Sequence, residues 1–337
     1  MATTKTRLEN LIYLPQLFIR LVLSMKKQKQ FLKETVSLDI ENSRMDNDGT
    51  LTDKDYKKMT GYYGFAVPAL LGEGFCLLRG KKMSKKERFG ITYLGASTGL
   101  FDDFFDDHNI STEHILEMIN SPHEEIAQNS NQKLFVKFWK VALGNTENTA
   151  QLKNAAFKVY NAQVLSQKQQ LKDTSAAEIE QITIAKGGLS ILFYRAVFEG
   201  KINEDEQKML NCLGGIGQLE NDIFDIYKDR ESGVRTLATI STKINHLRQS
   251  YTSLMEDTFS LVHQTHFAPK NKRRFLGFIS IIICRGFVCL DFLEKNELQT
   301  NNVFTLSKYV QKDLICDMGS YSNTLKLFDY YSKTSVY

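Results

Sequence analysis

Apolar residues recur every three or four positions along most of this chain, which is the period of an α-helix. The series Leu11, Leu14, Phe18, Leu21 and Met25 is an early example. Alternating apolar and polar runs, which are typical of half-buried strands, are scarce. Only four prolines occur in 337 residues, and no long Gly/Ser-rich or Pro-rich linker separates two halves. We therefore predict an all-α fold, a single domain over residues 1–337 with roughly ten or more helices.

The predicted helices can be placed by residue range. Besides an N-terminal helix, they cover residues 62–78, 84–107, 112–119, 132–143, 148–171, 176–198, 203–229, 242–263, 270–293 and 303–331. Ser84 and Glu87 have the spacing of a capping box, in which each side chain accepts from the backbone N–H of the other residue. Gly187 and Gly188 are unfavourable inside a helix, so they indicate a break there.

Composition narrows the class of protein. A formal charge of +4 without a sustained basic stripe argues against nucleic-acid binding. The five cysteines form no CxxC pair, which favours buried thiols in a reduced, cytoplasmic compartment.

Two segments are apolar enough to raise the question of a membrane. Residues 8–25 are interrupted by charge and by proline, and no small-residue cleavage site follows, so we predict a core helix and leave peripheral membrane contact as the alternative. Residues 275–290 are too few to span a bilayer and include Arg285, which predicts a buried helix. We therefore expect no transmembrane segment.

Two acidic clusters point to a chemistry. The first, DDFFDDH over residues 102–108, places Asp102 and Asp106 four positions apart. The second, QLENDIFDIYKD over residues 218–229, places Asn221, Asp225 and Asp229 in a ladder at the same spacing. Such residues project from nearly one face of a helix, and stacked carboxylates repel unless a cation joins them. Carboxylate and amide oxygens suit Mg²⁺, so each cluster predicts a magnesium site.

The pair of clusters resembles the two metal motifs of class I isoprenoid (terpene) synthases. Residues 102–106 match the first motif, DDxxD, and residues 221–229 resemble the second motif of terpene cyclases, with Asp225 and Asp229 replacing a hydroxyl residue and a glutamate. The resemblance implies one large helical bundle with a central active-site cavity that holds three Mg²⁺ ions, with Mn²⁺ as the alternative metal. The implied metal ligands are Asp102, Asp103, Asp106, Asn221, Asp225 and Asp229, and all of them except Asp103 are also the implied catalytic residues.

The implied activity is Mg²⁺-dependent ionisation of an allylic polyprenyl diphosphate to a carbocation, with release of diphosphate. A cyclase of this kind also needs cationic donors to the leaving group and an apolar pocket around the cation. The expected diphosphate donors are Lys186, Arg195, Lys228, Arg235, Lys308 and Tyr309. The expected pocket residues are Tyr93, Phe105, Phe193, Tyr194, Phe224, Gly187 and Gly188, for which core packing and close helix contact are the alternatives.

Two other functions remain open. Gln218 before the second cluster, and a DxxxD spacing in both clusters, also resemble squalene and phytoene synthases, which join two prenyl diphosphates head to head. The Gln218 spacing is similar to that of chain-elongating prenyltransferases too, but the basic stretches that would bind a second, homoallylic diphosphate are missing. A non-catalytic homologue that binds a prenyl diphosphate is the other possible function. The family resemblance is also compatible with a homodimer.

Overall fold

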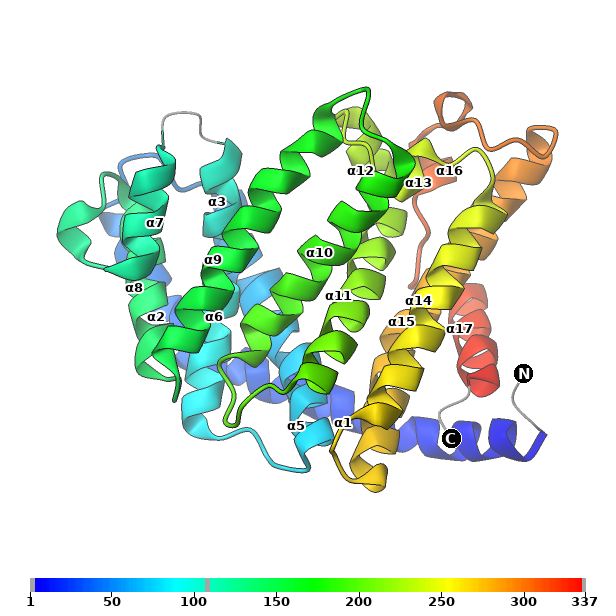
Figure 1. Cartoon of the computed structure of the whole chain (residues 1–337), viewed down its shortest axis with the longest axis horizontal. Coiled ribbons are helices and arrows are strands. Elements are labelled where there is room, and N and C mark those ends of the chain that lie inside the picture. The colour runs from blue at the N-terminus through cyan, green and yellow to red at the C-terminus, as the bar shows by residue number, and fades with distance from the viewer. Residues whose placement is uncertain (1–3, 107–109, 335–337) are drawn as a thin grey trace. The chain divides into compact units, whose positions relative to one another are not determined.

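The computed structural model describes residues 4–106 and 110–334, and within them it contains helices and no strand (Figure 1). The all-α prediction is therefore confirmed. The chain divides into two compact units. The first comprises Met1–Leu17, Leu165–Ile191 and Asn203–Tyr337, and the second comprises Phe18–Val164 and Leu192–Ile202. The boundaries fall inside three helices and one loop. Whether these two units form the single domain predicted over residues 1–337 stays a prediction.

Helices of the second unit surround an aromatic core. They are α1 (Thr4–Glu34, from residue 18), α2 (Val36–Met45), α3 (Asp53–Lys57), η1 (Lys58–Tyr63), α4 (Gly64–Ala66), η2 (Val67–Gly72), α5 (Glu73–Arg79), α6 (Lys85–Asp106), α7 (Thr112–Asn120), η3 (Glu124–Ile126), α8 (Ser130–Gly144) and α9 (Thr149–Ser166, to residue 164). Trp139 is buried in this core and its indole N–H donates to the Ile119 carbonyl at 2.9 Å. A polar atom of a core residue is thus satisfied by the end of a neighbouring helix.

The first unit is built from longer helices. Besides the start of α1 it contains η4 (Gln167–Gln170), α10 (Ala176–Arg195, to residue 191), α11 (Glu204–Phe224), α12 (Ile226–Glu231), α13 (Leu237–Ile240), α14 (Ile244–Gln264), α15 (Pro269–Gln299), η5 (Leu306–Lys308), α16 (Gln311–Leu314) and α17 (Tyr321–Lys333). Figure 1 shows α10 beside α11 and α14 beside α15. Tyr251 of α14 is fully buried, and its hydroxyl donates to the Ile283 carbonyl of α15 at 2.7 Å.

Several local predictions are confirmed. The Ser84 N–H donates to Glu87 Oε2 at 2.8 Å and the Glu87 N–H donates to Ser84 Oγ at 3.1 Å, so the capping box forms where the spacing placed it. All five cysteines are free thiols; Cys212 is half-buried and the other four are buried.

The glycine pair does not break its helix, contrary to the prediction. Helix α10 runs through Gly187 and Gly188 and crosses α11 closely. A Cβ built on Gly187 would lie 2.0 Å from the Gly214 carbonyl oxygen, and one on Gly188 would lie 2.8 Å from the Asn211 Cα. Both glycines were expected to line a pocket, and this is a correction: backbone of α11 occupies the space beside them.

The segment predicted as one helix over 62–78 is more irregular. Two π-helical stretches, η1 and η2, interrupt it. The wide turn of η1 packs closely on α6, since a Cβ built on Gly95 would lie 2.7 Å from the Tyr63 carbonyl oxygen. Such π-helical turns are frequent near functional sites, and here the turn carries Tyr63 toward the first acidic cluster.

The predicted helix over 303–331 is wrong in its first half. Asn301 and Asn302 adopt positive φ after α15 ends, and only the short elements η5 and α16 precede α17, which begins at Tyr321. Arg230 explains the irregular backbone between them, because its Nη1 donates to the carbonyls of Leu306 at 3.1 Å and Tyr309 at 2.7 Å. A side chain from α12 thus takes the place of helical backbone partners.

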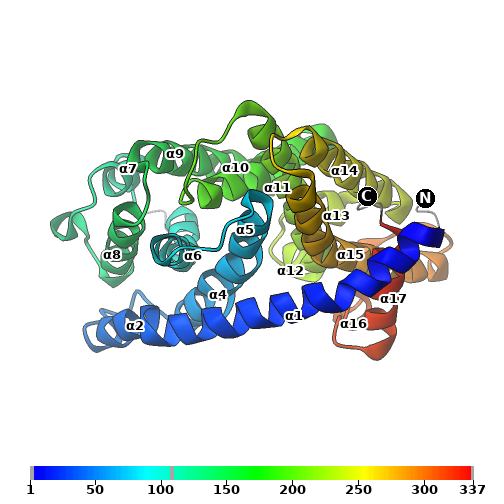
Figure 2. The same cartoon turned by 90° about the horizontal axis from the view of Figure 1, so that it is seen from below.

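Three helical stretches of the described chain are long and apolar enough to cross a membrane: Thr6–Met45, Asp53–Arg79 and Pro269–Gln299. The most apolar window of α15 is 78% buried, which confirms the buried helix, although α15 is much longer than the apolar run. The corresponding window of the N-terminal stretch is only 22% buried. The predicted N-terminal core helix is therefore wrong; α1 runs into α2 as a long helical stretch (Figure 2), and much of its apolar surface faces outward.

Candidate functional site

The first acidic cluster lies at the C-terminal end of α6. The carboxylate of Asp102 accepts from the Tyr63 hydroxyl at 3.2 Å and from Gln163 Nε2 of α9 at 2.5 Å. These two donors are neutral, so they orient the carboxylate without cancelling its charge. Burial raises the pKa of Tyr63 above its usual value and the charge of Asp102 raises it further, so the phenol stays a hydrogen-bond donor at neutral pH.

Asp103, the next residue, has a cationic partner. Lys58 Nζ lies 2.9 Å from one of its carboxylate oxygens and 3.7 Å from Asp55 Oδ1. Burial would lower the pKa of Lys58, but these acids outweigh it and the pKa is raised, so the lysine stays charged. Asp103 is thus in an ion pair with Lys58, and the charges of Lys58 and Asp102 also act on one another. The side chain of Asp106, and Asp107 and His108 altogether, lie outside the described residues.

The second acidic cluster lies where α11 meets α12. The helix predicted over 203–229 is interrupted at Asp225, which has φ −89° and ψ 9° and separates the two elements. The backbone spacing nevertheless persists: the Asp225 N–H donates to the Asn221 carbonyl and the Asp229 N–H to the Asp225 carbonyl, both at 2.8 Å. The ladder therefore survives in the main chain although one continuous helix does not.

The side chains of this cluster are not the ones that the ladder predicts. Asn221 is exposed, whereas its neighbour Asp222 is only 4% exposed. Asp222 accepts from Gln218 Nε2 at 2.9 Å and from the Thr183 hydroxyl of α10 at 3.3 Å. The acids of this cluster are thus Asp222, Asp225 and Asp229, and Asn221, a predicted metal ligand, lies exposed beside them.

Burial and charge repulsion raise the pKa values of two of these acids. Burial raises the pKa of Asp229 to about 7, and the charges of Asp222 and Asp225 add to that rise. Burial also raises the pKa of Asp222 to about 6, against the hydrogen bond from Gln218 and the charge of Lys186. The ionised forms of these carboxylates are therefore disfavoured at neutral pH, and a bound cation would favour them.

Two of the predicted diphosphate donors lie beside this cluster. Lys186 of α10 acts on both Asp222 and Asp229, whose pKa values its charge lowers. Lys228 is 3.2 Å from Asp225 Oδ2 and its side chain is 72% exposed, so it can turn toward an incoming anion. The charges of two lysines therefore act on this group of acids.

The other predicted donors have structural partners. Arg195 is buried and its Nη1 donates to the Phe198 carbonyl at 3.2 Å, past the end of α10. Arg235 Nη1 donates to the carbonyls of Leu171 at 3.0 Å and Thr174 at 2.6 Å. Each guanidinium holds a loop, and neither is available to a diphosphate in this structure, which corrects both assignments.

The two predicted donors at residues 308 and 309 differ in their surroundings. Lys308 is exposed. Tyr309 is buried against Phe304, at 4.9 Å between ring centroids, and its hydroxyl shares a 2.6 Å hydrogen bond with Thr300. Tyr309 is therefore a packing residue of the loop after α15 rather than a donor to a ligand.

The predicted pocket aromatics contact neighbouring side chains of their own units, and Phe105, Phe193 and Phe224 remain half-buried. Tyr93 and Tyr194 are buried, and their hydroxyls bond Asp39 and Thr98 at 2.7 and 2.8 Å. Ring contacts place Phe105 5.4 Å from Tyr160, Phe193 5.9 Å from Trp139, and Phe224 5.0 Å beneath the guanidinium of Arg285. Core packing, the alternative stated for these residues, describes the contacts that each makes.

Sequence reasoning missed Lys58, Tyr63 and Gln163 around Asp102, and Thr183 beside Asp222. These residues come from other helices, and no local spacing marks them. Gln218 carried a signal, since it lies one turn before Asp222. Hydrogen bonds between residues of different helices depend on which helices pack together. A single sequence does not reveal that packing.

The donor chemistry fits a magnesium ion better than the geometry does. All candidate ligands offer oxygen, which Mg²⁺ prefers. Burial, with repulsion from neighbouring acids, raises the pKa values of Asp222 and Asp229, and a bound cation would favour their ionised forms. Within the described residues, however, no three acidic, histidine or cysteine side chains are grouped so as to hold a metal ion.

Comparison with known proteins adds no relative. A scan of family models, a search of curated proteins and a search of solved structures each found no match.

Proposed function

We propose that this protein is a Mg²⁺-dependent enzyme of the class I isoprenoid synthase type, a terpene cyclase that ionises an allylic polyprenyl diphosphate. The observation that carries the proposal is the cluster of Asp222, Asp225 and Asp229 with Lys186 and Lys228 beside it. Acids that repel one another next to two ammonium groups suit a ligand that brings both cations and phosphate oxygens. The helical bundle with a central active-site cavity belongs to the same proposal.

The residues have separate roles in it. Asp225 and Asp229 would hold metal, with Asp222 positioned by Gln218 and Thr183. Lys186 and Lys228 would donate to the diphosphate oxygens. A metal ion bound there neutralises the diphosphate and makes it a better leaving group.

The first cluster would bind metal through oxygen ligands of its own unit. Asp102 is held in place by Tyr63 and Gln163, which fixes its carboxylate before any metal arrives. Asp103 would have to break its ion pair with Lys58 before it could bind a metal ion. We therefore propose Asp102 as the preferred metal ligand of the two.

Head-to-head condensation of two prenyl diphosphates is the second candidate, and one observation favours it. Asp222 rather than Asn221 is buried in the cluster and accepts a hydrogen bond from Gln218. The glutamine with the following aspartates was the feature similar to prenyl-transferring enzymes. The two candidates differ in product: transfer gives a doubled carbon skeleton, whereas cyclisation keeps the carbon number of the substrate.

The test is turnover by the full chain. Purified protein with Mg²⁺ and allylic diphosphates of several lengths should release pyrophosphate, and the mass of the hydrocarbon product separates cyclisation from transfer. Asp225→Asn and Asp102→Asn should each abolish release, whereas Asp257→Asn, which removes an exposed carboxylate on α14, should not.

Two results would count against the proposal. Release that persists in Asp225→Asn and Asp102→Asn would refute the assignment of the clusters. Mg²⁺-dependent binding of the diphosphates without any release would leave only the non-catalytic reading.

A further inference from the structure

The outward face of α1 carries an apolar row in the second unit. Ile19, Val22 and Leu23 are 61%, 45% and 60% exposed. They lie at positions i, i+3 and i+4, which is one face of a helix. An amphipathic helix in a globular protein normally packs its apolar face against the core. An exposed apolar row therefore indicates a surface that binds a partner or a membrane.

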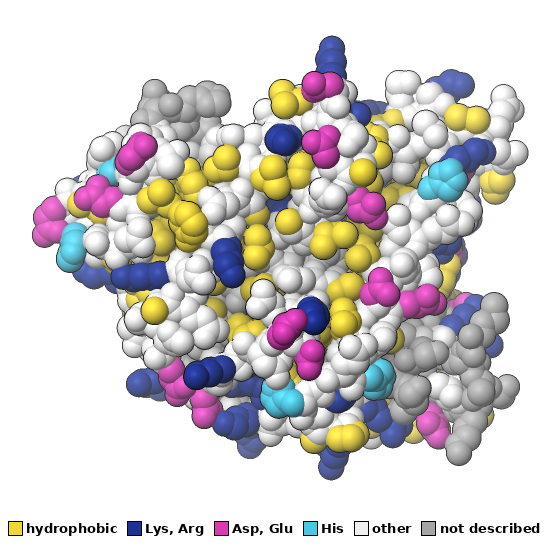
Figure 3. All heavy atoms as spheres, viewed as in Figure 1, with side chains coloured by type: hydrophobic (Ala, Val, Ile, Leu, Met, Phe, Trp, Pro, Cys, Tyr) yellow, Lys and Arg dark blue, Asp and Glu magenta, His cyan; other side chains and the backbone are white. Residues whose placement is uncertain are grey.

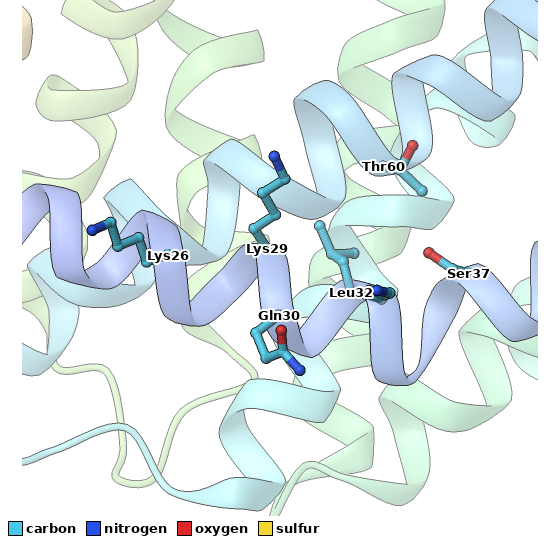
Figure 4. Close-up of a pocket in the computed structure, with 7 residues that line it drawn as sticks. Lys26, Lys29, Gln30, Leu32, Ser37 and Thr60 are labelled. Atoms are coloured by element: carbon cyan, nitrogen blue, oxygen red, sulfur yellow. The ribbon is translucent and has the colours of Figure 1, made fainter.

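A row of lysines continues the same face. Lys26, Lys29 and Lys33 follow Leu23 at helical spacing, and all three are exposed. They line a cavity of about 490 Å³ together with Gln30, Leu32, Ser37 and Thr60 (Figure 4). The lining side chains come from α1, α2 and η1 of one unit, so the cavity opens beside the apolar row.

Polar contacts on the inner face fix how α1 is held. Arg20 Nε bonds Glu73 at 2.6 Å, Ser24 Oγ donates to the Ala69 carbonyl at 3.0 Å, and Gln28 Nε2 donates to the Gly64 carbonyl at 2.8 Å. A helix that crossed a membrane would have to give up these bonds. A helix lying flat keeps them and still offers its outer face.

We propose that this face of α1 docks on a membrane that contains anionic phospholipid. Ile19, Val22 and Leu23 would enter the boundary between headgroups and acyl chains, as the apolar faces of interfacial helices do. The lysine cavity would take a phosphorylated headgroup. The proposal uses none of the acidic residues of the two clusters and does not depend on the proposed function.

Charge complementarity selects this occupant. From residue 10 to residue 33, α1 has five basic residues and no acidic one. The apolar row and the lysines share one outer face of α1, so a flat helix can bring both to the headgroup region of a bilayer. By contrast, the face of the molecule in Figure 3 shows basic side chains scattered among acidic ones and no comparable row.

Co-sedimentation of the full chain with vesicles tests the proposal, using phosphatidylcholine alone or mixed with phosphatidylserine. The triple variant Lys26→Gln, Lys29→Gln and Lys33→Gln should lose about 100-fold in affinity for the anionic vesicles, from about tenfold or less for each lysine. The variant Ile19→Ser, Val22→Ser and Leu23→Ser should bind neither vesicle. The matched controls, exposed residues elsewhere, are Lys201→Gln, Lys270→Gln and Lys312→Gln, and Leu298→Ser, Val310→Ser and Leu325→Ser.

Four results would overturn it. Equal affinity for both kinds of vesicle would show that anionic lipid is not recognised. Equal losses of affinity in the control variants would show that this face of α1 is not the binding surface. Release of bound protein by inorganic phosphate as readily as by added anionic vesicles would make the cavity a site for free phosphate. A variant of the apolar row that dissociates a dimer while vesicle binding stays intact would assign the row to a second copy of this chain. Circular dichroism of each variant confirms that the fold is retained.

Discussion

Replacing Asp222 by asparagine should make the protein more stable at alkaline pH. The folded-state pKa of Asp222 is raised from 3.8 to about 6 because the group is buried. A carboxylic acid with a raised pKa binds its proton more tightly in the folded state, so stability is lost as pH rises from about 4 through about 6. A shift of about two units corresponds to about 3 kcal/mol. Asparagine cannot ionise, and it keeps an acceptor for Gln218 and a partner for Thr183.

Denaturant unfolding in EDTA, followed at several pH values, measures this effect. The two proteins should have similar unfolding free energies near pH 4, and at about pH 8 Asp222→Asn should exceed the wild type by about 3 kcal/mol. Asp257→Asn, an exposed aspartate on α14, is the control and should follow the wild type. If Asp222→Asn and the wild type changed in parallel with pH, the burial and repulsion assigned to this acid would be refuted.

Three further predictions concern packing, an ion pair and the metal. Gly187→Ala should lower the free energy of unfolding by about 1–3 kcal/mol or more, because its Cβ would collide with the Gly214 carbonyl; an unchanged melting temperature would contradict this close approach. Glu87→Gln should cost about 3–5 kcal/mol, because it leaves Arg79 buried without the carboxylate that lies 2.7 Å away; a denaturation midpoint like that of the wild type would count against it. Mg²⁺ should raise the melting temperature more at about pH 8 than at about pH 5, since Asp222 and Asp229 must lose their protons to bind it, and a pH-independent rise would argue against binding at these acids.

Local signals predicted much of the fold. The capping box of Ser84 and Glu87 needs only residues three apart, and it forms as expected. Predictions failed where distant residues decide the outcome. Gly187 and Gly188 remain helical because Gly214 allows α11 to approach, and residues 303–309 are irregular because Arg230 binds their carbonyls.

The outward face of α1 shows another limit of pattern reading. Its 3–4 periodicity correctly predicted a helix, but the same apolar pattern is compatible with either an inward or an outward row. Arg20, Ser24 and Gln28 decide the question, since their bonds to η2, α5 and α4 turn the other face toward the body of the unit.

The candidate site was predicted in its composition but only partly in its arrangement. Spacing alone singled out Asp225 and Asp229; in the structure Lys228 pairs with Asp225, and the charges of Lys186 and Lys228 lower the pKa of Asp229 against burial. The exchange of Asn221 for Asp222 depends on which face of α11 packs on α10, and a break at Asp225 changes that face within one turn. Periodicity assumes an unbroken helix and cannot register such a break.

A crystal structure grown with Mg²⁺ and an unreactive thiodiphosphate analogue of an allylic substrate tests the central claim most directly. We expect metal ions on the carboxylates of Asp225 and Asp102, and diphosphate oxygens within hydrogen-bonding distance of Lys186 and Lys228. Analogue and metal bound away from both acidic clusters, with Asp222 and Asp229 still lacking a cation, would contradict the account.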